Sequence, residues 1–377
     1  MLSTNPLPSW SALLAATNSA NHRADALSEN TWGNPRLQVW LGRGAWSFLA
    51  VAQWLRRKTG HNPIVWVPDY FCSPSLVLLR RSGAKIVYYP VGENLCPSLS
   101  QIDCLMDSGH PDILVVVHYF GIPRNFNQML SRLGGVPKLI IEDAAHALRP
   151  CSGVGSIGDV VLYCPHKHLG IPHGAVLVTR DSVMAQELEQ ELQSLGSSAP
   201  SVGRWYVRKA LQKALPKSIP RLLRPVQIGE FWSDAPAPPV GDDCRMNSSV
   251  HTLLRFAKVD QVAKDRRQAD SSLRTVLTQI GGWTPICDTW GDATPYRTVM
   301  RCKDEMTAGS RYSFFRSRGY PVETWGSLAE EVRTEKETHQ EAHRLRKTIL
   351  LFPFDSRDAE AGAELAQRIL RQCKGMS

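Results

Sequence analysis

The sequence predicts an α/β protein built on a mostly parallel, seven-stranded sheet with helices on both faces. Apolar runs that are continuous rather than alternating recur at 64–68, 85–91, 113–117, 139–141, 160–163 and 175–179. Continuous runs are typical of parallel strands that are buried on both faces. Segments with apolar residues at helical spacing lie between these runs, for example from 45 to 58. This alternation predicts a doubly wound sheet.

The composition limits the class of protein. The chain has 377 residues, of which 43% are hydrophobic, so it is long enough for a large core and a second domain. The nine cysteines show no paired spacing, which predicts reduced thiols and a cytoplasmic location. No apolar run has the length of a membrane span, and residues 1–30 lack the pattern of a signal peptide. The net charge of +9 favours anionic ligands, and no nucleic-acid-binding motif is evident.

The same patterns suggest a division into an N-terminal arm (1–35), a large α/β domain (36–240) and a small C-terminal α+β domain (241–377). Residues 200–240 form a basic and proline-rich linker region, in which 204–224 holds seven basic residues and no acid. A solvated helix explains this segment, and contact with a membrane surface is the alternative.

Further elements follow from local pattern and turn signals. We expect helices at 74–82, 181–195, 248–277, 308–318 and 358–373, and strands at 296–301, 319–322 and 350–353.

Two of the expected strands end on functional side chains. The run 139–141 leads into Glu142, Asp143 and then His146, and the run 160–163 leads into a segment that contains Lys167. Ligands of open α/β sheets bind at the carboxyl edge. A carboxylate and an amine there suit pyridoxal 5'-phosphate (PLP), which needs a lysine for its aldehyde and an acid for its pyridine nitrogen. Alternatively, Asp143 caps the strand end and Lys167 is a solvated loop residue.

Two other stretches fit the same ligand. Gly42, Arg43 and Gly44 precede a helix, and the free N–H groups of a helix N-terminus bind phosphate. A simple helix cap is the alternative. Tyr70 or Phe71, after the run 64–68, would offer a flat face to a cationic ring, and the sequence does not choose between them. Alternatively, both are core aromatics.

In order, these motifs resemble those of the DegT/DnrJ/EryC1/StrS family of fold-type I PLP-dependent aminotransferases. The family's EDAAQA or EDAAHA motif is matched by 142–147, its GSFGD by 155–159, its K-x-L by 167–169 and its G-R-x-A by 42–45. The resemblance implies a fold-type I PLP-transferase in which Lys167, Asp143 and His146 are catalytic. It also implies that the cofactor contacts Gly42, Arg43, Gly44, Tyr70 or Phe71, Asp143, Cys164 and Lys167, in a homodimer without a metal.

The chain also departs from the family pattern. The interval from Asp159 to Lys167 is shorter than in typical members, and Cys164 stands where a phosphate-binding serine is usual. His173 occupies a place that is usually acidic, and Asp243 replaces an asparagine. A divergent subgroup with a short lysine loop would explain these changes, and so would a protein that keeps the fold with altered chemistry.

The resemblance implies transfer of an amino group from glutamate or glutamine to a nucleotide-linked keto-sugar, in polysaccharide or secondary-metabolite biosynthesis. The alternatives are a PLP-dependent dehydratase or lyase, and a non-catalytic protein on the same fold. Relatives that dehydrate sugars carry histidine in place of the lysine, so Lys167 favours the aminotransferase. An imidazolium at His166 or His168, which flank Lys167, would also favour the neutral amine.

Overall fold

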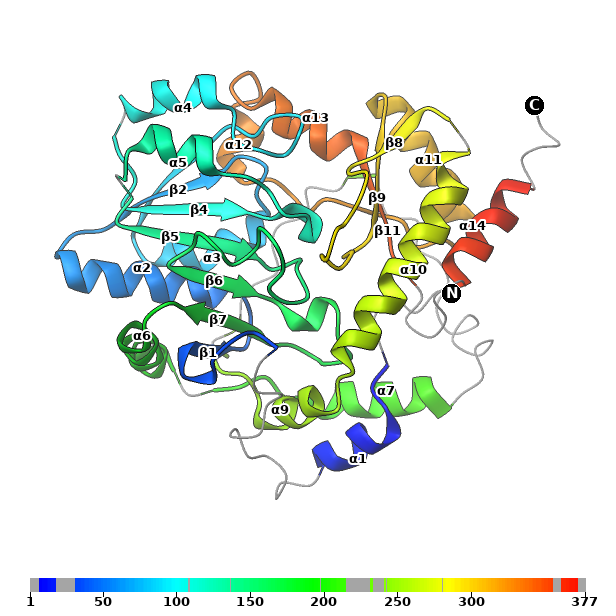
Figure 1. Cartoon of the computed structure of the whole chain (residues 1–377), viewed down its shortest axis with the longest axis horizontal. Coiled ribbons are helices and arrows are strands. Elements are labelled where there is room, and N and C mark those ends of the chain that lie inside the picture. Colours follow the sequence, from blue (N-terminus) through cyan, green and yellow to red (C-terminus); the bar gives the residue numbers. More distant parts are fainter. Residues whose placement is uncertain are drawn as a thin grey trace.

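The structure is a computed structural model that describes residues 7–17, 31–107, 109–135, 137–196, 198–214, 231–232, 241, 243–279, 281–354 and 361–371. A large sheet lies on one side of the molecule and a small antiparallel sheet on the other (Figure 1). The large sheet has the strand order β1-β7-β6-β5-β4-β2-β3. Its strands are β1 (Gln38–Leu41), β2 (Ile64–Pro68), β3 (Lys85–Tyr89), β4 (Ile113–Val117), β5 (Leu139–Ala144), β6 (Val160–Tyr163) and β7 (Ala175–Thr179).

The predicted seven-stranded, mostly parallel sheet is confirmed. β3, β2, β4, β5 and β6 pair in parallel, whereas β7 pairs antiparallel with both β6 and β1. All five residues of β4 are buried, as the continuous apolar run requires. The sequence pattern missed β1, because four residues directly before a glycine carry little strand signal.

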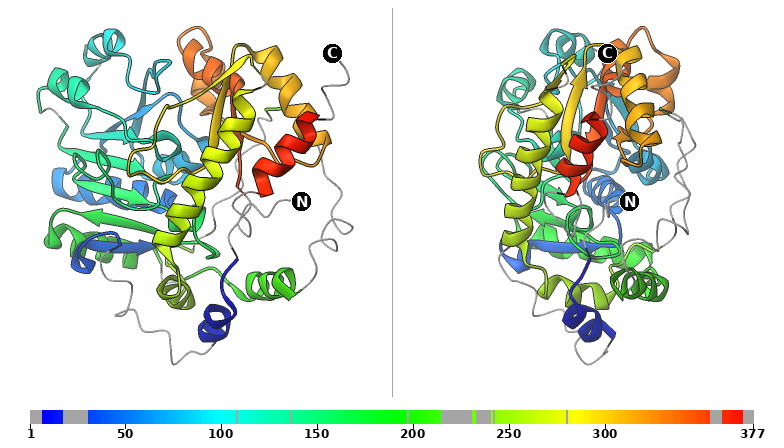
Figure 2. Two further views of the ribbon diagram at one scale, coloured as in Figure 1. Left: turned by 45° about the vertical axis from the view of Figure 1, so that its right-hand side comes forward. Right: turned by 90° about the vertical axis from the view of Figure 1, so that its right-hand side faces the viewer.

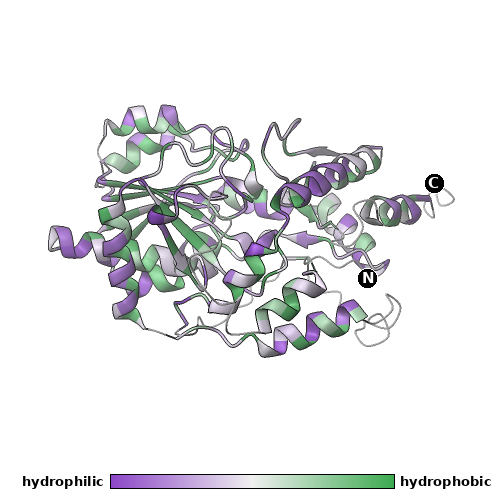
Figure 3. Ribbon diagram, turned by 60° about the horizontal axis from the view of Figure 1, so that its bottom comes forward, coloured by the Kyte–Doolittle hydropathy of each residue, from purple (hydrophilic) through white to green (hydrophobic). Residues whose placement is uncertain are grey.

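The helices of the large sheet are α2 (Ala45–Thr59), α3 (Ser73–Arg81), α4 (Leu99–Met106), α5 (Asn127–Leu133) and α6 (Ser182–Leu195). α2 buries one apolar face that includes Phe48, Val51 and Leu55, and it packs on α3 and α6. It ends where Gly60 adopts a left-handed conformation (φ 79°) and donates its N–H to the carbonyl of Arg56. Figure 3 shows the strands mainly hydrophobic and the outer helices with hydrophilic faces.

The small sheet has the order β10-β11-β9-β8, with β8 (Trp283–Pro285), β9 (Thr298–Cys302), β10 (Glu323–Thr324) and β11 (Ile349–Phe352). Its helices are α11 (Glu305–Ser317), α12 (Glu330–Thr334), α13 (Gln340–Thr348) and α14 (Ala361–Arg371). The strand expected at 319–322 is wrong, because Gly319 turns left-handed (φ 83°) after α11 and Pro321 lacks an N–H for the ladder. The strand begins later, at Glu323.

The single helix expected at 248–277 is also wrong, because the structure has two helices there, α9 (Ser248–Arg255) and α10 (Val259–Thr278). Val250 and Leu253 of α9 join a cluster with the N-terminal helix α1 (Trp10–Thr17), and Val259 at the start of α10 belongs to the same cluster. The later part of α10, with Leu273 and Leu277, joins the core of the small sheet. In Figure 2, α10 crosses between the two halves of the molecule.

The main core crosses position 240, because Leu328, Val332 and Leu345 pack in one cluster with the strands of the large sheet. The domain division at 240/241 therefore stays a prediction. Of the basic segment, α7 (Gly203–Ala214) is described, and residues 215–224 and the connector 235–240 lie outside the described residues. Residues 1–6 and 18–30 of the predicted arm also lie outside them. Within the described residues no helix is long and apolar enough to cross a membrane.

Candidate active site

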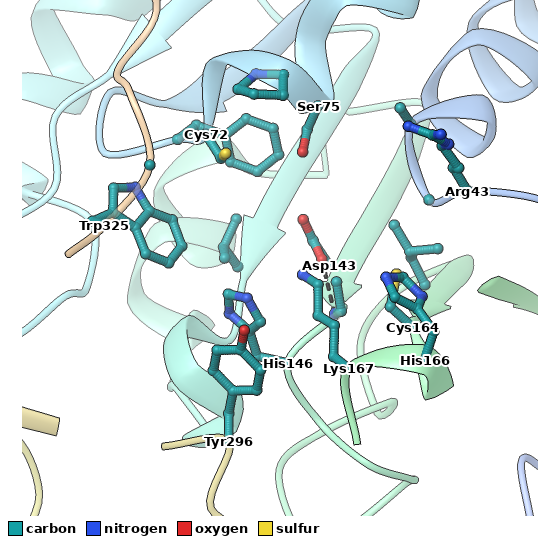
Figure 4. A pocket seen from close by; sticks show the side chains of 18 of the residues that line it. Arg43, Cys72, Ser75, Asp143, His146, Cys164, His166, Lys167, Tyr296 and Trp325 are labelled. Carbon is teal, nitrogen blue, oxygen red and sulfur yellow. Dashed lines mark hydrogen bonds between the residues drawn. The ribbon is translucent and has the colours of Figure 1, made fainter. Parts of the chain in front are cut away.

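A cavity of about 590 Å³ opens where β4, β5 and β6 end and where α2 and α3 begin (Figure 4). Its walls include Asp143 and His146 from the first motif and Lys167 from the second, together with Arg43 and Phe71. The cavity therefore lies at the carboxyl edge that the sequence predicts, and it has the volume of a typical small-molecule site.

Asp143 reaches the cavity from the end of β5, where it pairs in register with Leu162 of β6. The side chain is 8% exposed, and its Oδ1 accepts a hydrogen bond from the N–H of Ala145 at 2.9 Å. Burial raises the pKa of this carboxyl, and the nearby Lys167 opposes that rise only in part. In the described part of the chain, Asp143 forms no ion pair, so it faces the cavity as a buried acid without a counter-ion.

Lys167 ends a short 3₁₀ turn (Pro165–Lys167) that follows β6. The backbone N–H of Lys167 donates to the carbonyl of Cys164 at 3.0 Å, and Nη2 of Arg266 from α10 donates to the carbonyl of Lys167 at 3.5 Å. Nζ of Lys167 has no ion pair within the described residues. In Figure 4 this amine and the Asp143 carboxyl point into the same space. The structure thus brings the predicted acid and amine together.

Glu142, the neighbour of Asp143, has a structural role. It is fully buried, and its carboxylate accepts from Nε2 of His118 at 2.8 Å and from the N–H groups of Gly158, Ile157 and Gly155. Burial alone would raise the pKa of Glu142, but the hydrogen bonds to His118 and the backbone outweigh it and lower the pKa. Because His118 N–H also donates to the Asp143 carbonyl at 3.0 Å, this network fixes the end of β5.

His146 lines the cavity as a neutral ring. It stacks on Tyr296 with ring centroids 4.3 Å apart and 15° between the planes, and Phe120 lies parallel to it with its centroid at 6.3 Å. Burial and then the charge of Lys167 hold the pKa of His146 well below its usual range. The ring therefore offers an apolar face and neutral nitrogens beside Lys167, and its direct contact with the cofactor stays a prediction.

The histidines on either side of Lys167 are also neutral. Nδ1 of His166 donates to the carbonyl of Gly174 at 2.8 Å, and burial lowers its pKa to about 4. Nε2 of His168 donates to the carbonyl of His146 at 2.9 Å, and burial lowers its pKa well below the usual value. Neither ring therefore supplies the imidazolium that would favour a neutral amine at Lys167, because desolvation holds both pKa values below the usual value of a histidine.

The glycines before α2 form a tight backbone corner. Gly42 N–H donates to the carbonyl of Cys244 at 2.8 Å, and the carbonyl of Gly42 accepts from Gly174 N–H at 3.1 Å. A Cβ on Gly42 would lie 2.6 Å from the carbonyl oxygen of Asp243. The first turn of α2 contains no acid, so its positive end opens into the cavity, with the exposed Arg43 at the rim.

Cys164 lies against this corner, since a Cβ on Gly44 would be 3.0 Å from its sulfur. Burial raises the pKa of Cys164 to about 11, so the residue is a neutral thiol. Of the two aromatic candidates, Phe71 lines the cavity and Tyr70 does not. Tyr70 is fully buried and stacks on Trp325 with centroids 5.0 Å apart, as a core aromatic would.

Several lining residues had no role in the sequence-based assignment, namely Cys72, Ser75, His173, Tyr296, Glu323 and Trp325. Cys72 and Ser75 are placed by the start of α3, whereas Tyr296, Glu323 and Trp325 come from the small sheet. No local pattern marks these last three, because only the packing of the two sheets brings them to the cavity. His173 is 9% exposed, and both of its ring nitrogens are enclosed without a hydrogen-bond partner among the described residues.

The side chains and backbone groups that line the cavity suit PLP. Among the described residues, neither the buried Asp143 carboxyl nor the Lys167 amine has an ion-pair partner, and the start of α2 offers backbone donors. Phe71 and His146 add flat apolar surfaces. Together with the seven-stranded sheet, these groups define a PLP-dependent enzyme of fold type I.

Comparison with known proteins identifies the family. The profile of the DegT/DnrJ/EryC1/StrS aminotransferase family matches residues 58–317, and the chain belongs to this family. The family is PLP-dependent, and PLP is the cofactor of this chain. No curated protein matches the sequence.

Solved structures share the fold over almost the whole chain. The aminotransferase TlmJ from Streptoalloteichus hindustanus superposes with a TM-score of 0.70 at 17% identity, covering 100% of this chain and 99% of that one. The sugar aminotransferase CalS13 from Micromonospora echinospora gives 0.66 at 17% identity, covering 99% and 100%. An E. coli GDP-4-keto-6-deoxy-D-mannose-3-dehydratase with bound hydrated PLP gives 0.67 at 14% identity, covering 98% and 100%.

Proposed function

We propose that this protein is an aminotransferase that moves an amino group from glutamate or glutamine to a nucleotide-linked keto-sugar. The observation that carries the proposal is the meeting of Asp143 and Lys167 in one cavity. Family membership supports transamination, and the similarity to a sugar aminotransferase supports a sugar acceptor. The net charge of +9 and Arg43 at the cavity rim suit an anionic substrate.

When bound, the cofactor supplies an electron sink for the bonds at the substrate carbon. Asp143, at the end of β5, holds a proton on the pyridine nitrogen. Lys167 would hold the cofactor through its aldehyde, and its Nζ would accept the proton from Cα of the amino donor. The start of α2 at Gly42–Gly44 would bind the phosphate through N–H groups other than that of Gly42, which is bonded to Cys244. Phe71 rather than Tyr70 would pack on the ring.

The buried walls exclude water from the reacting groups. Burial keeps three histidines neutral, namely His146, His166 and His168. They therefore add no positive charge beside Lys167 and do not compete with it for an anion. Tyr296 and Trp325 close the cavity from the small sheet. The resemblance to the family further supports a cytoplasmic homodimer, because fold-type I sites are shared across a subunit interface.

A sugar dehydratase is the second candidate, because an E. coli dehydratase has the same fold. The presence of Lys167 favours transamination, since some relatives that dehydrate sugars carry histidine at this position. The sugar product separates the two activities, because a transaminase leaves an amino group on the sugar and a dehydratase removes water from it.

The test is the visible spectrum of the PLP-loaded protein, with and without glutamate, for wild type and Lys167→Ala. We expect a covalently attached cofactor in wild type, a spectral change on adding glutamate, and neither in Lys167→Ala. Lys138→Ala is the matched control, because Lys138 is half exposed and pairs with Asp112 at 2.8 Å, away from the cavity. Wild type without a covalent cofactor, or Lys167→Ala with one, would contradict the proposal.

A further inference from the structure

A second cavity, of about 530 Å³, lies where the two sheets meet and shares no lining residue with the candidate active site. Glu93 and Asn94 reach it from the loop between β3 and α4, and Arg124 reaches it from the segment between β4 and α5. β8 and Arg301 of β9 form the opposite wall. Residues from both sheets therefore surround a space large enough for a small-molecule ligand.

Arg124 is a cation without a counter-ion in this wall. Its Nε and Nη2 are enclosed and have no hydrogen-bond partner, and the described part of the chain contains no ion pair of this residue. Burial lowers the pKa of Arg124, and the charge of Arg301 adds to that effect. An enclosed guanidinium nitrogen without a partner is costly, because its N–H donor has lost water and gained nothing in return.

The opposite wall adds a second arginine. Nη1 of Arg301 donates to Oε1 of Glu93 at 3.0 Å, and Nη2 donates to the Glu93 carbonyl, but its Nε is enclosed without a partner among the described residues. Glu93 also pairs with Arg344 at 3.2 Å, and Arg344 pairs with Glu341 at 2.7 Å. Two guanidinium groups, of Arg124 and Arg301, thus line the cavity with one carboxylate, of Glu93, and the excess charge of its walls is positive.

We propose that this cavity binds an oxyanion, a phosphate or carboxylate group, between Arg124 and Arg301. A guanidinium presents parallel N–H donors that match the oxygens of such a group, and both arginines line the same cavity. The ligand would bridge the large sheet and the small sheet. The site is separate from the catalytic cavity, so the inference stands whether or not the proposed transamination is right.

The experiment uses PLP-loaded protein in buffer free of phosphate and sulfate, so that the catalytic phosphate site is filled. Thermal unfolding and calorimetric titration follow the addition of inorganic phosphate or of uridine diphosphate. We expect both methods to show binding to wild type. Arg124→Met and Arg301→Met should each weaken it about 10- to 100-fold, the effect of losing a charged hydrogen-bond partner. Tighter binding of the diphosphate that Arg124→Met weakens would identify an organic phosphate as the ligand of this cavity, because binding at the catalytic cavity does not involve Arg124. Equal binding of the two probes would identify a free oxyanion.

Two control variants make the result specific. Arg132→Met, on α5, removes an exposed arginine that pairs with Asp103 outside the cavity, and it should bind like wild type. Lys167→Ala should also bind the anion, which separates this site from the catalytic proposal. Arg124→Met should fold, because the change removes a buried charge. Wild type that binds neither probe, or Arg124→Met that binds like wild type, would overturn the inference.

Discussion

Asp143 and Arg124 are buried charges of opposite sign, and each faces a cavity. Neither has an ion-pair partner in the described part of the chain, and burial moves the pKa of each toward the neutral form, upward for Asp143 and downward for Arg124. The difference lies in their surroundings. Asp143 stands at a strand end between motif residues, whereas Arg124 stands between loops of two sheets. The comparison teaches that a charge without an ion-pair partner at a cavity wall is a reason to test for a ligand, even where no sequence motif marks the residue.

The largest expected effect is on the catalytic side. Asp143→Asn keeps the hydrogen bond to Ala145 but removes the negative charge, so the pyridine nitrogen loses its counter-ion. We expect the glutamate half-reaction to slow about 100- to 1,000-fold with PLP still bound, measured by stopped-flow absorbance. The PLP-free variant should also be more stable than wild type at pH 7 by about 1–3 kcal/mol, because a buried charge is gone.

Asp304→Asn is the matched control for that change, because Asp304 caps α11 through Thr307 and lies outside the cavity. It should leave the half-reaction unchanged. A rate for Asp143→Asn within threefold of wild type would break the assignment of Asp143 as the acid of the cofactor ring.

The second expected effect is on stability, and it tests the contact between His118 and Glu142, the buried acid next to Asp143. His118→Ala leaves Glu142 buried without its partner, and we expect a loss of about 3–5 kcal/mol in the free energy of unfolding at pH 7. Because the pKa of Glu142 lies below its ordinary value of 4.5, its ionised form contributes stability above that pH. This contribution disappears as the pH falls through the lowered pKa, so wild type and variant should converge below pH 4.5.

Urea unfolding at pH 7 and at pH 4 measures both parts of that prediction. His61→Ala serves as the control, because His61 is half exposed and its contact with Asp112 is on the surface. It should change the free energy of unfolding by less than about 1 kcal/mol. Equal losses in the free energy of unfolding for His118→Ala and His61→Ala would show that burial does not determine how much the contact between His118 and Glu142 stabilises the protein.

The third effect concerns the backbone corner before α2. Gly42→Ala places a Cβ 2.6 Å from the Asp243 oxygen and 2.9 Å from the Arg245 oxygen, so the backbone must shift. We expect PLP to bind about 10- to 100-fold more weakly, measured by fluorescence titration of the PLP-free protein. Gly203→Ala has open space around it and should bind PLP like wild type.

The smallest expected effect is on the second cavity. Arg124→Met should raise the free energy of unfolding without added anion by about 1 kcal/mol, because an apolar side chain replaces an unpaired buried cation. Arg132→Met should leave it nearly unchanged. Urea unfolding in phosphate-free buffer measures the difference. A clear loss of stability in Arg124→Met would mean that the guanidinium has a partner, and the parallel with Asp143 would fail.

Much of the catalytic cavity could be predicted because strand ends are local features. The apolar runs before Asp143 and Lys167 place both residues at one edge of a parallel sheet, and the structure has them in one cavity. The choice between Tyr70 and Phe71 could not be made, because neighbouring residues point in different directions and only the packing of Trp325 against Tyr70 takes that ring out of the cavity.

The charges of the histidines also could not be predicted. His166 and His168 flank the lysine in sequence, but their depth of burial sets their protonation, and burial is a tertiary property.

The sequence alone determined the sheet, its carboxyl edge, and the acid and amine that the strands carry there. The reason is that hydrophobic periodicity and the position of a residue at a strand end are properties of short stretches of sequence. Only the tertiary structure decided which side chains complete the catalytic cavity and that Arg124 and Arg301 share a second one. These residues lie far apart along the chain, and no local pattern records that two sheets will pack and leave their charges facing each other.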